Sequence, residues 1–510
     1  MRLCLPVLLF LAIPLSAAAQ EHMGEHPAPE KLGQVSFPTT CSPAVQAKFE
    51  RAVALLHSFA YHVADEAFEE VAREDPKCAM AGWGEAMANF HQIWEPPISP
   101  AGLERGRAAI DWAQKISPVS AREREYIAAL APMFLDAGSI PYATRLQRYE
   151  QAMGALAEHN PRDPEARIFY ALALLATAPA DDKTHQHQKQ AVALLEPLHR
   201  EFPEHPGVVH YMIHAYDNAE MAPQGAEVAR AYARIAPSAP HALHMPSHIF
   251  TRLGLWNESI QSNLAARAAA HQQGDIGEEL HAMDYLVYAY LQSGRDTDAA
   301  GVLRDLRGMG TLPGGFKTGY AATAMPVRYA VERRRWAEAA ECSAVQGASP
   351  WVEAVAVWAR AVGRARGGNP TAAQTEIATL DRLEQKSRAL GDAYWAEQVH
   401  IQVLEASGWA AQTSGKSADA AAALRSAADE EDGIEKRPVT PGPVTPAREQ
   451  LADLLLEQGH AKEALAEYEI SLRASPGRRG ALTGALEAAK RVGNQQKVSF
   501  YSKALEPAAR

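Results

Sequence analysis

The 510-residue sequence has few cysteines, no excess of positive charge and, beyond its first residues, no long uncharged run. Its 4 cysteines are too few for a disulfide-stabilised scaffold. The 50 Lys and Arg residues against 61 Asp and Glu residues give a formal net charge of -11, so the chain lacks the basic field that holds nucleic acid or anionic lipid. Beyond the N-terminus no window of about 20 residues is free of charge, which argues against a membrane-spanning helix.

Motifs of the common enzyme classes are also missing. The sequence contains no GxSxG nucleophile motif, no phosphate-binding Gly-rich loop, no HExxH and no CxxC. Runs with a two-residue hydrophobic period are scarce as well, which argues against β-sheet. The sequence therefore favours an all-α protein and gives no positive indication of catalysis.

The N-terminus has the pattern of a secretory signal peptide. Arg2 precedes an apolar stretch over residues 3–15, and the small residues 16–19 follow as a cleavage site. We expect residues 1–19 to be removed and the mature protein to be periplasmic or secreted. Residues 20–43 contain several prolines and glycines and are predicted to form a flexible leader.

Helix-forming Ala, Leu, Glu, Arg and Gln dominate the rest of the chain, with apolar residues spaced three and four apart. The stretch AREQLADLLLEQGHAKEALAEYEISLRASP indicates two helices around a turn at Gly459, with Ala464 and Tyr468 on the second helix and Pro476 at its end. This unit resembles the tetratricopeptide repeat, whose period is about 34 residues, and about a dozen such units follow residue 44.

This resemblance implies an all-α fold, a right-handed superhelical solenoid of helix hairpins in which each hairpin contacts mainly its neighbours. We predict an N-terminal solenoid over residues 44–310, middle helical repeats over 311–437, a Pro-rich linker over 438–446 and C-terminal hairpins over 447–510. Prolines stiffen the linker, and Val439 and Val444 can anchor it. We expect it to be ordered and packed on the solenoid, either as a rigid spacer or as a peptide-like segment in the groove.

Three cysteines remain once the signal peptide is removed, and an exported protein meets an oxidising compartment. Cys41 precedes the first helix of the first hairpin, and Cys78 follows its second helix. These two ends lie side by side in an antiparallel hairpin, so we predict a disulfide between Cys41 and Cys78. Cys342 is then left as a free thiol.

Two pairs of histidines coincide when the sequence is shifted by one repeat. FPEHPGVVHYMIHAYD aligns with IAPSAPHALHMPSHIF at a displacement of about 34 residues, so that His210 falls on His244 and His214 falls on His248. Each pair has i, i+4 spacing, which places both imidazoles on one face of a helix, close enough to share a metal ion.

In tetratricopeptide-repeat proteins the second, fifth, ninth, twelfth and thirteenth positions of the first helix line a concave ligand groove. The resemblance places the paired histidines at the fifth and ninth positions. We therefore predict one inner cluster made of His210, His214, His244, His248, His281 and Asp284. The resemblance also places Tyr288 at the ninth position, His241 at the second, and His57 and His91 at the thirteenth. We predict these four residues to line the ligand groove.

Three interpretations of the histidine cluster are open from the sequence. The imidazoles can satisfy one another, backbone carbonyls and carboxylates such as Asp217; they can bind a metal ion; or they can carry out acid-base chemistry. A metal site would need neutral imidazoles oriented by hydrogen-bond acceptors behind them. With histidine and carboxylate ligands and no thiolate, such a site would favour zinc or copper.

Beyond the generic repeat, the sequence is similar to a family of bacterial exported tetratricopeptide-repeat proteins. The stretches that carry this similarity are DPKCAMAGWGEAM, DPEARIFYALALL, HPGVVHYMIHAYD, APHALHMPSHIFTRLGLW, HAMDYLVYAYLQ and VTPGPVTPAREQLADLLLEQG. The resemblance implies the fold and export, and no particular activity. Our leading hypothesis is a scaffold whose groove binds a protein or peptide partner. The alternative is a metal-binding protein or metal-dependent enzyme that uses the histidine cluster; the oligomeric state is left open.

Overall fold

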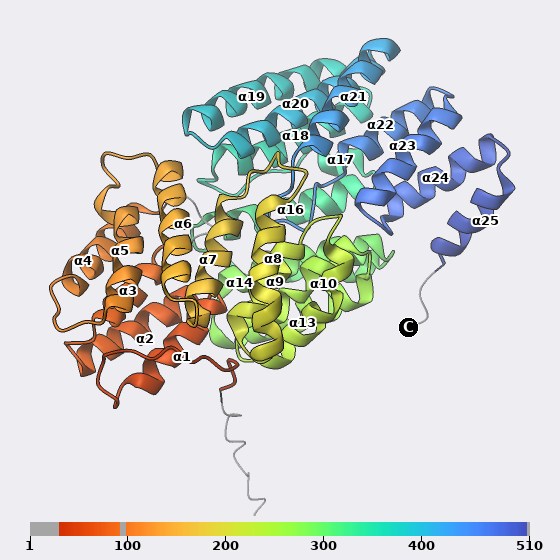
Figure 1. The fold of residues 1–510 in the computed structure, drawn as a ribbon. Helices are drawn as coiled ribbons and strands as arrows, with labels where there is room; N and C mark the ends of the chain where they lie inside the picture. The colour runs from red at the N-terminus through yellow and green to blue at the C-terminus, as the bar shows by residue number, and fades with distance from the viewer. Residues whose placement is uncertain (1–29, 92–97, 507–510) are drawn as a thin grey trace, which may run out of the picture.

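The computed structural model describes residues 30–91 and 98–506, which form 25 α-helices. The helices pair in chain order into hairpins, and successive hairpins stack side by side along a curved path (Figure 1). The predicted all-α solenoid of tetratricopeptide-type hairpins is confirmed. Within the described part of the chain, none of the helices is both long and apolar enough to cross a bilayer.

The first four hairpins are α1 (Gln46–His57) with α2 (Tyr61–Glu74), α3 (Ala79–Ala88) with α4 (Pro100–Ala113), α5 (Ala121–Leu135) with α6 (Tyr142–His159), and α7 (Pro164–Thr177) with α8 (Gln186–Glu201). The next four are α9 (Pro206–Tyr216) with α10 (Ala222–Ile235), α11 (Pro240–His244) and α12 (Pro246–Arg252) with α13 (Trp256–Gln273), α14 (Ile276–Gln292) with α15 (Asp296–Gly308), and α16 (Phe316–Glu332) with α17 (Trp336–Ala339). The last four are α18 (Pro350–Arg366) with α19 (Pro370–Ala389), α20 (Ala393–Thr413) with α21 (Ser417–Gly433), α22 (Ala447–Glu457) with α23 (Ala461–Ala474), and α24 (Arg479–Arg491) with α25 (Gln495–Ala504).

Successive hairpins pack through small residues set against large ones. Phe68 on α2 and Tyr468 on α23 are fully buried, and each ring lies against a glycine of the following helix, Gly84 or Gly484. A Cβ atom added at either glycine would overlap the aromatic ring. Because protein interiors are close packed, these pairs set how near one hairpin can approach the next.

The segment before α1 is packed from residue 30 onward. Phe37 is fully buried, with its ring centroid 5.1–5.6 Å from those of Phe49, Trp83 and Tyr126. The prediction of a flexible leader over residues 20–43 is therefore wrong for its described part, because one aromatic side chain anchors a stretch whose proline and glycine content suggested disorder. The predicted signal peptide, residues 1–19, lies outside the described residues.

A disulfide ties this segment to the far end of the first hairpin. Cys41 and Cys78 are bonded, with their Cα atoms 4.5 Å apart, as the hairpin geometry predicted. Cys342 is the free cysteine of the described residues.

Replacing Cys41 and Cys78 together with serine should lower the free energy of unfolding by about 2–4 kcal/mol, because the bridge restricts the unfolded chain. Urea denaturation of the oxidised protein and the double variant measures this difference. Cys342→Ser breaks no bridge and is the matched control. Equal denaturation midpoints for the wild type and the double variant would contradict the prediction.

Residues 434–446, which we call the strap, lie on the inner face of the superhelix. Val439, Thr440 and Val444 are buried. The strap backbone is held by Glu435 N donating to Ala180 O at 2.7 Å, Tyr285 Oη donating to Thr440 O at 3.2 Å, and Arg328 Nη1 donating to Pro443 O at 3.1 Å. The predicted ordered packing of the Pro-rich segment is confirmed, and the segment lies in the groove as a peptide-like chain.

We expect the strap to resist proteolysis in the folded protein, because cleavage requires local unfolding of a backbone that is anchored and hydrogen-bonded. The mostly exposed loop at residues 309–315, which also contains thermolysin-sensitive apolar residues, is the internal control. Limited thermolysin digestion followed by mass spectrometry should show cleavage in the loop first. Early cleavage within the strap would show that it is not held as described.

The C-terminal hairpins close back on the middle of the chain. Arg478, just before α24, donates to Tyr288 Oη at 3.0 Å and pairs with Glu332 at 2.7 Å.

Buried apolar residues form three clusters, which span residues 32–250, 260–325 and 320–501. The predicted division at residue 310 falls inside the second of these clusters, since α14 and α16 pack directly together.

Candidate metal centre

Four buried helices position the inner histidines. They are α9 with His210 and His214, α11 with His241 and His244, α12 with His248, and α14 with His281. Pro206 and Pro240 begin α9 and α11, where the missing N–H would have no intrahelical partner anyway. Pro246 ends α11 and begins α12, because proline cannot donate to the carbonyl four residues before it.

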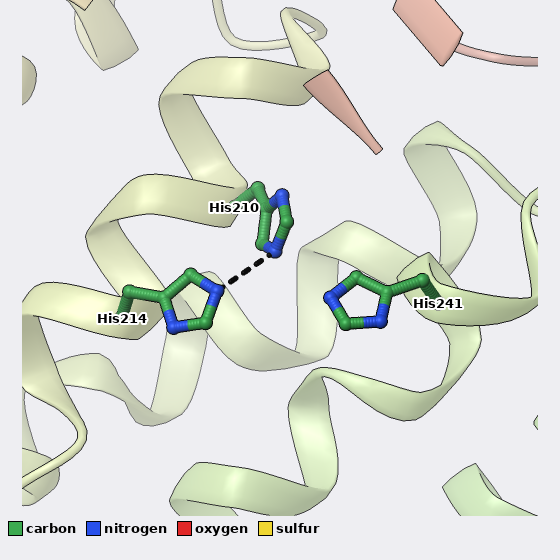
Figure 2. A group of neighbouring side chains, drawn as sticks. All are labelled: His210, His214 and His241. Atoms are coloured by element: carbon green, nitrogen blue, oxygen red, sulfur yellow. Dashed lines mark hydrogen bonds between the residues drawn. The ribbon is translucent and has the colours of Figure 1, made fainter. Parts of the chain in front are cut away.

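His210, His214 and His241 form a first triad (Figure 2). One ring nitrogen of each lies within 4.8 Å of the other two, and the Nε2 atoms of His210 and His214 are 3.1 Å apart. The three residues are 0–8% exposed. The first helices of two adjacent repeats therefore bring these rings together inside the protein.

His244, His248 and His281 form a second triad with the same internal spacing, within 4.8 Å. The Nε2 atoms of His244 and His248 are 3.0 Å apart, and the rings of His244 and His281 have centroids 4.3 Å apart. These residues are 0–2% exposed.

The two triads are neighbours. The ring centroids of His214 and His248 are 6.1 Å apart, and those of His241 and His244 are 6.0 Å apart. The predicted meeting of histidines from adjacent repeats is thus present, and we call the six residues the six-histidine cluster. His241, which the repeat register placed elsewhere in the groove, belongs to it.

Hydrogen-bond acceptors orient two rings of the first triad. His210 Nδ1 donates to the backbone carbonyl of His57 at 2.6 Å. His241 Nδ1 lies 3.3 Å from Glu278 Oε2. Such acceptors hold the proton on Nδ1 and leave the Nε2 lone pair to bind a metal ion.

In the second triad, the neutral imidazoles of His244 and His248 cannot form a hydrogen bond with each other, because the acceptors behind them fix the proton of each ring on Nδ1. His244 Nδ1 faces Asn263 Oδ1 at 2.6 Å, and the amide orientation is set because Asn263 Nδ2 donates to the carbonyl of Ser259 at 2.8 Å. His248 Nδ1 faces the carboxylate of Asp217 at 2.9 Å. Both Nδ1 atoms therefore carry the proton, and the two Nε2 lone pairs point at each other. A cation between them, either a proton or a metal ion, removes the repulsion.

Burial disfavours a proton as the cation between His244 Nε2 and His248 Nε2. It lowers the pKa of His248 to about 4, although Asp217 acts to raise it. It also lowers the pKa of four more imidazoles of the cluster well below the ordinary value, at His210, His214, His244 and His281. At neutral pH these five imidazoles are therefore in the uncharged form that metal ions bind.

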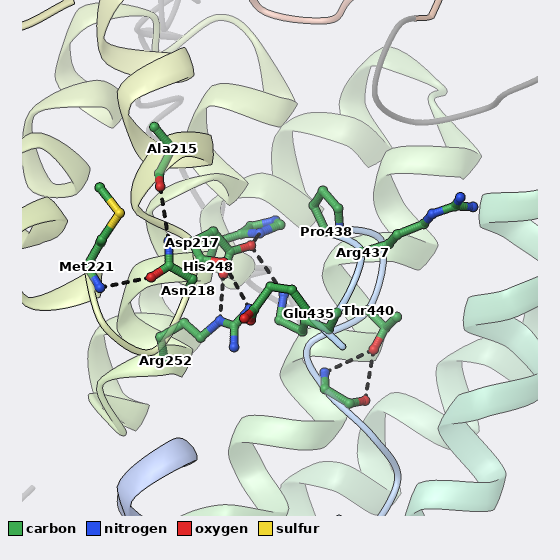
Figure 3. A network of polar contacts seen from close by, with 12 residues as sticks. Ala215, Asp217, Asn218, Met221, His248, Arg252, Glu435, Arg437, Pro438 and Thr440 are labelled. Carbon is green, nitrogen blue, oxygen red and sulfur yellow. Dashed lines mark hydrogen bonds and ion pairs between the residues drawn. The ribbon is translucent and has the colours of Figure 1, made fainter. Parts of the chain in front are cut away.

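Asp217 belongs to a charged network that includes the strap (Figure 3). Its carboxylate accepts from Arg252 Nε at 2.8 Å and from Lys436 Nζ at 3.2 Å, and Arg252 also pairs with Glu435 at 2.9 Å. Although burial would raise the pKa of Asp217, Lys436 and Arg252 hold it well below its usual range. The strap therefore completes the polar shell behind the second triad.

Tyr285 lies between the second triad and the strap. Its ring stands perpendicular to that of His244, with centroids 4.6 Å apart. Its hydroxyl is 3.4 Å from His248 Nε2 and 3.2 Å from the carbonyl of Pro438. The tyrosine thus encloses the second triad on the strap side.

Two cavities reach the first triad. A cavity of about 200 Å³ is lined by His241 together with Phe59, His91 and Lys317. A larger one of about 560 Å³ is lined by His214 and by strap residues that include Lys436. Small solutes can therefore approach two of the first-triad histidines from outside.

A further buried group lies behind the first triad. The fully buried Glu165 is 2.9 Å from Nε2 of both His57 and His205, and His57 Nδ1 is 2.9 Å from the Tyr211 hydroxyl. The two histidines lower the pKa of Glu165 to about 2, against the effect of burial. These hydrogen bonds position His57, whose carbonyl in turn holds His210. Sequence reasoning missed the group because Glu165 lies 108 residues from His57.

Of the other predicted site residues, two differ from the prediction and two line cavities. Asp284 is not a ligand of the cluster, because the buried Arg328 guanidinium binds it at 2.8 Å. His57 does not line a groove, because its ring is enclosed by the group around Glu165. Tyr288 lines a cavity together with the strap residues Thr440 and Gly442, as predicted for a groove position, and its hydroxyl accepts from Arg478 of the C-terminal hairpins. His91 lines the smaller cavity.

No protein-family model and no curated protein matches the sequence. Among solved structures, the chain is similar to the human IFIT1 dimer with PPP-AAAA, at 13% sequence identity and a TM-score of 0.37, over 90% of this chain and 89% of that chain. It is similar to a monomeric IFIT1 mutant with Gppp-AAAA at 13% identity and a TM-score of 0.34, over 89% of this chain and 95% of that chain. Likeness at this level carries no argument about ligand or family, so the site stands on its own geometry.

Proposed function

We propose that this protein binds a divalent transition-metal ion, zinc or copper, at the second triad, His244, His248 and His281. The observation that carries the proposal is the opposed pair of Nε2 lone pairs 3.0 Å apart. Two nitrogens bound at about 2.0–2.1 Å to one tetrahedral zinc ion lie about 3.3–3.4 Å apart. A small movement of the two rings would therefore replace a repulsion with two coordinate bonds.

The donor set supports this choice of ion. Neutral imidazoles suit zinc and copper, whereas calcium and magnesium prefer oxygen ligands. Asp217 behind His248 and Asn263 behind His244 are the acceptors that metal-bound histidines require.

Protein purified from its native compartment in metal-free buffer should carry at least one zinc or copper ion per chain, measured by plasma mass spectrometry. The variant His244→Asn/His248→Asn should lose one ion relative to the wild type, because two of three ligands are gone. His460→Asn, at a side chain that is 55% exposed, is the matched control and should retain it. Wild-type protein that carries no metal and takes up neither Zn²⁺ nor Cu²⁺ in calorimetry would refute the proposal.

The competing hypothesis, a scaffold that presents its groove to a protein or peptide partner, has weaker support. The strap already lies on the inner face, and its buried Val439 and Val444 occupy the surface that a partner would need. A partner in this groove would have to displace the strap and its hydrogen bonds. We therefore place metal binding first.

We further propose that the protein is exported and works in the periplasm or outside the cell. The disulfide between Cys41 and Cys78 supports this location, because such bonds persist in oxidising compartments. The N-terminal cleavage pattern supports it independently.

A further inference from the structure

We infer that the six-histidine cluster is a dinuclear centre, in which a second transition-metal ion binds His210, His214 and His241 beside the ion at the second triad. This inference rests on the proposed function of the second triad. It adds a second site, a two-ion stoichiometry and an opening toward solvent.

The first triad has the donor atoms for its own ion. The His57 carbonyl holds the proton of His210 on Nδ1, so His210 Nε2 carries a lone pair. His214 Nε2 is 3.1 Å away and can donate its proton there when no ion is present. A metal ion between the two nitrogens requires only that His214 move its proton from Nε2 to Nδ1. This change conserves protons, and His241 supplies the third nitrogen within 4.8 Å.

One short helix serves both triads. His241 and His244 both belong to α11, and their ring centroids are 6.0 Å apart. His214 and His248 bridge the triads on the other side at 6.1 Å. Ions bound in the two triads would therefore be immediate neighbours.

Each triad also has its own buried carboxylate. Glu278 faces His241 of the first triad, and Asp217 faces His248 of the second. Each carboxylate is itself paired with a cation: Glu278 with Lys317 at 2.6 Å, and Asp217 with Arg252 at 2.8 Å and Lys436 at 3.2 Å. The two carboxylates therefore orient the imidazole behind each ion.

The first triad is the one that solvent can approach. The smaller cavity ends at His241 and the larger one at His214. Three protein ligands and access for a small molecule are the arrangement of metal sites that exchange a fourth ligand. The ion at the first triad is therefore expected to bind small ligands from solution, such as water or an added anion.

Metal stoichiometry in the wild type and three variants tests this inference. Wild-type protein loaded with Zn²⁺ and then desalted should hold two ions per chain. His214→Asn should hold one, and His281→Asn should hold one. His460→Asn, with an exposed side chain, should hold two. Circular dichroism and thermal denaturation establish that each variant is folded.

The outcomes separate the two proposals. No ion in the wild type would refute both. Suppose that the wild type holds one ion, which persists in His214→Asn and is lost in His281→Asn. This result would overturn the proposed ion at the first triad and leave the one at the second triad. One ion lost in either variant would show a single shared ion, which also overturns the dinuclear centre.

A measurement on the wild type alone covers the case in which a variant fails to fold. The metal-free protein is titrated with Cu²⁺ and followed by electron paramagnetic resonance. Addition of the second equivalent should broaden the spectrum and produce a half-field transition, because the two ions are close. Two equivalents that bind with narrow, magnetically isolated signals, or a single equivalent at saturation, would overturn the inference.

Discussion

Replacing Arg328 with methionine is expected to lower the free energy of unfolding by about 3–5 kcal/mol. Arg328 and Asp284 are both fully buried, with Arg328 Nε 2.8 Å from Asp284 Oδ1. Methionine keeps the volume of the side chain but leaves the Asp284 carboxylate buried without its cation. The variant also loses the hydrogen bond from Arg328 to the strap carbonyl of Pro443. Urea denaturation at pH 7 measures the loss.

A surface ion pair provides the control for Arg328. Arg335 pairs with Glu338 at 2.7 Å, and both side chains are 49% exposed. Arg335→Met should therefore cost less than about 1 kcal/mol. The double variant Arg328→Met/Asp284→Asn should recover part of the loss, because it removes the uncompensated charge. A loss at Arg328→Met no larger than that at Arg335→Met would show that burial of the pair is not what makes it important.

The metal-free protein should lose stability steeply as the pH falls from about 6.5 toward about 4. Burial lowers the pKa of His248 to about 4 in the folded protein, whereas an unfolded chain titrates its histidines near 6.5. Below pH 6.5 the unfolded chain binds a proton that the folded protein does not. The free energy of unfolding therefore falls by up to about 1.4 kcal/mol per pH unit for each such imidazole. This contribution is fully present above pH 6.5 and is lost as the pH approaches 4.

Chemical denaturation in chelator at pH 7, 6 and 5 checks this dependence. Several carboxyl groups act in the opposite direction, because burial raises the pKa of Glu85 and of Glu431 to about 7 and that of Glu405 well above its usual range. Comparison with His248→Asn isolates the histidine, since that variant should reduce the pH slope by about one proton. An identical slope in the wild type and the variant would contradict a neutral, buried His248.

The sequence by itself determined the contacts that recur from one repeat to the next. His210 and His244, like His214 and His248, occupy equal places in adjacent repeats, so the helix period and the repeat length were enough to bring their rings together. The disulfide followed in the same way, because Cys41 and Cys78 stand at the two ends of one hairpin. Such contacts are local, and a repeat protein encodes them directly in its spacing.

The position of a residue within the repeat does not determine which neighbouring group its side chain binds. Asp284 lies at the predicted inner position, but its carboxylate pairs with the buried Arg328 of the next repeat at 2.8 Å. The acceptors Asn263 and Glu278 were also missed, because an asparagine or glutamate carries no sequence signal for the ring it will orient. Which of several neighbouring groups a side chain binds depends on distances that only the folded protein defines.

Tertiary structure alone decided that the histidines are enclosed. Small rotations between repeats accumulate into the pitch of the superhelix, and no single repeat reveals that sum. The observed pitch brings Arg478 back to Tyr288 and lays the strap across the inner face. This closure buries the second triad, and burial lowers the pKa of its three imidazoles. The spacing of the histidines is thus a property of the sequence, and their burial and neutral charge are properties of the closed superhelix.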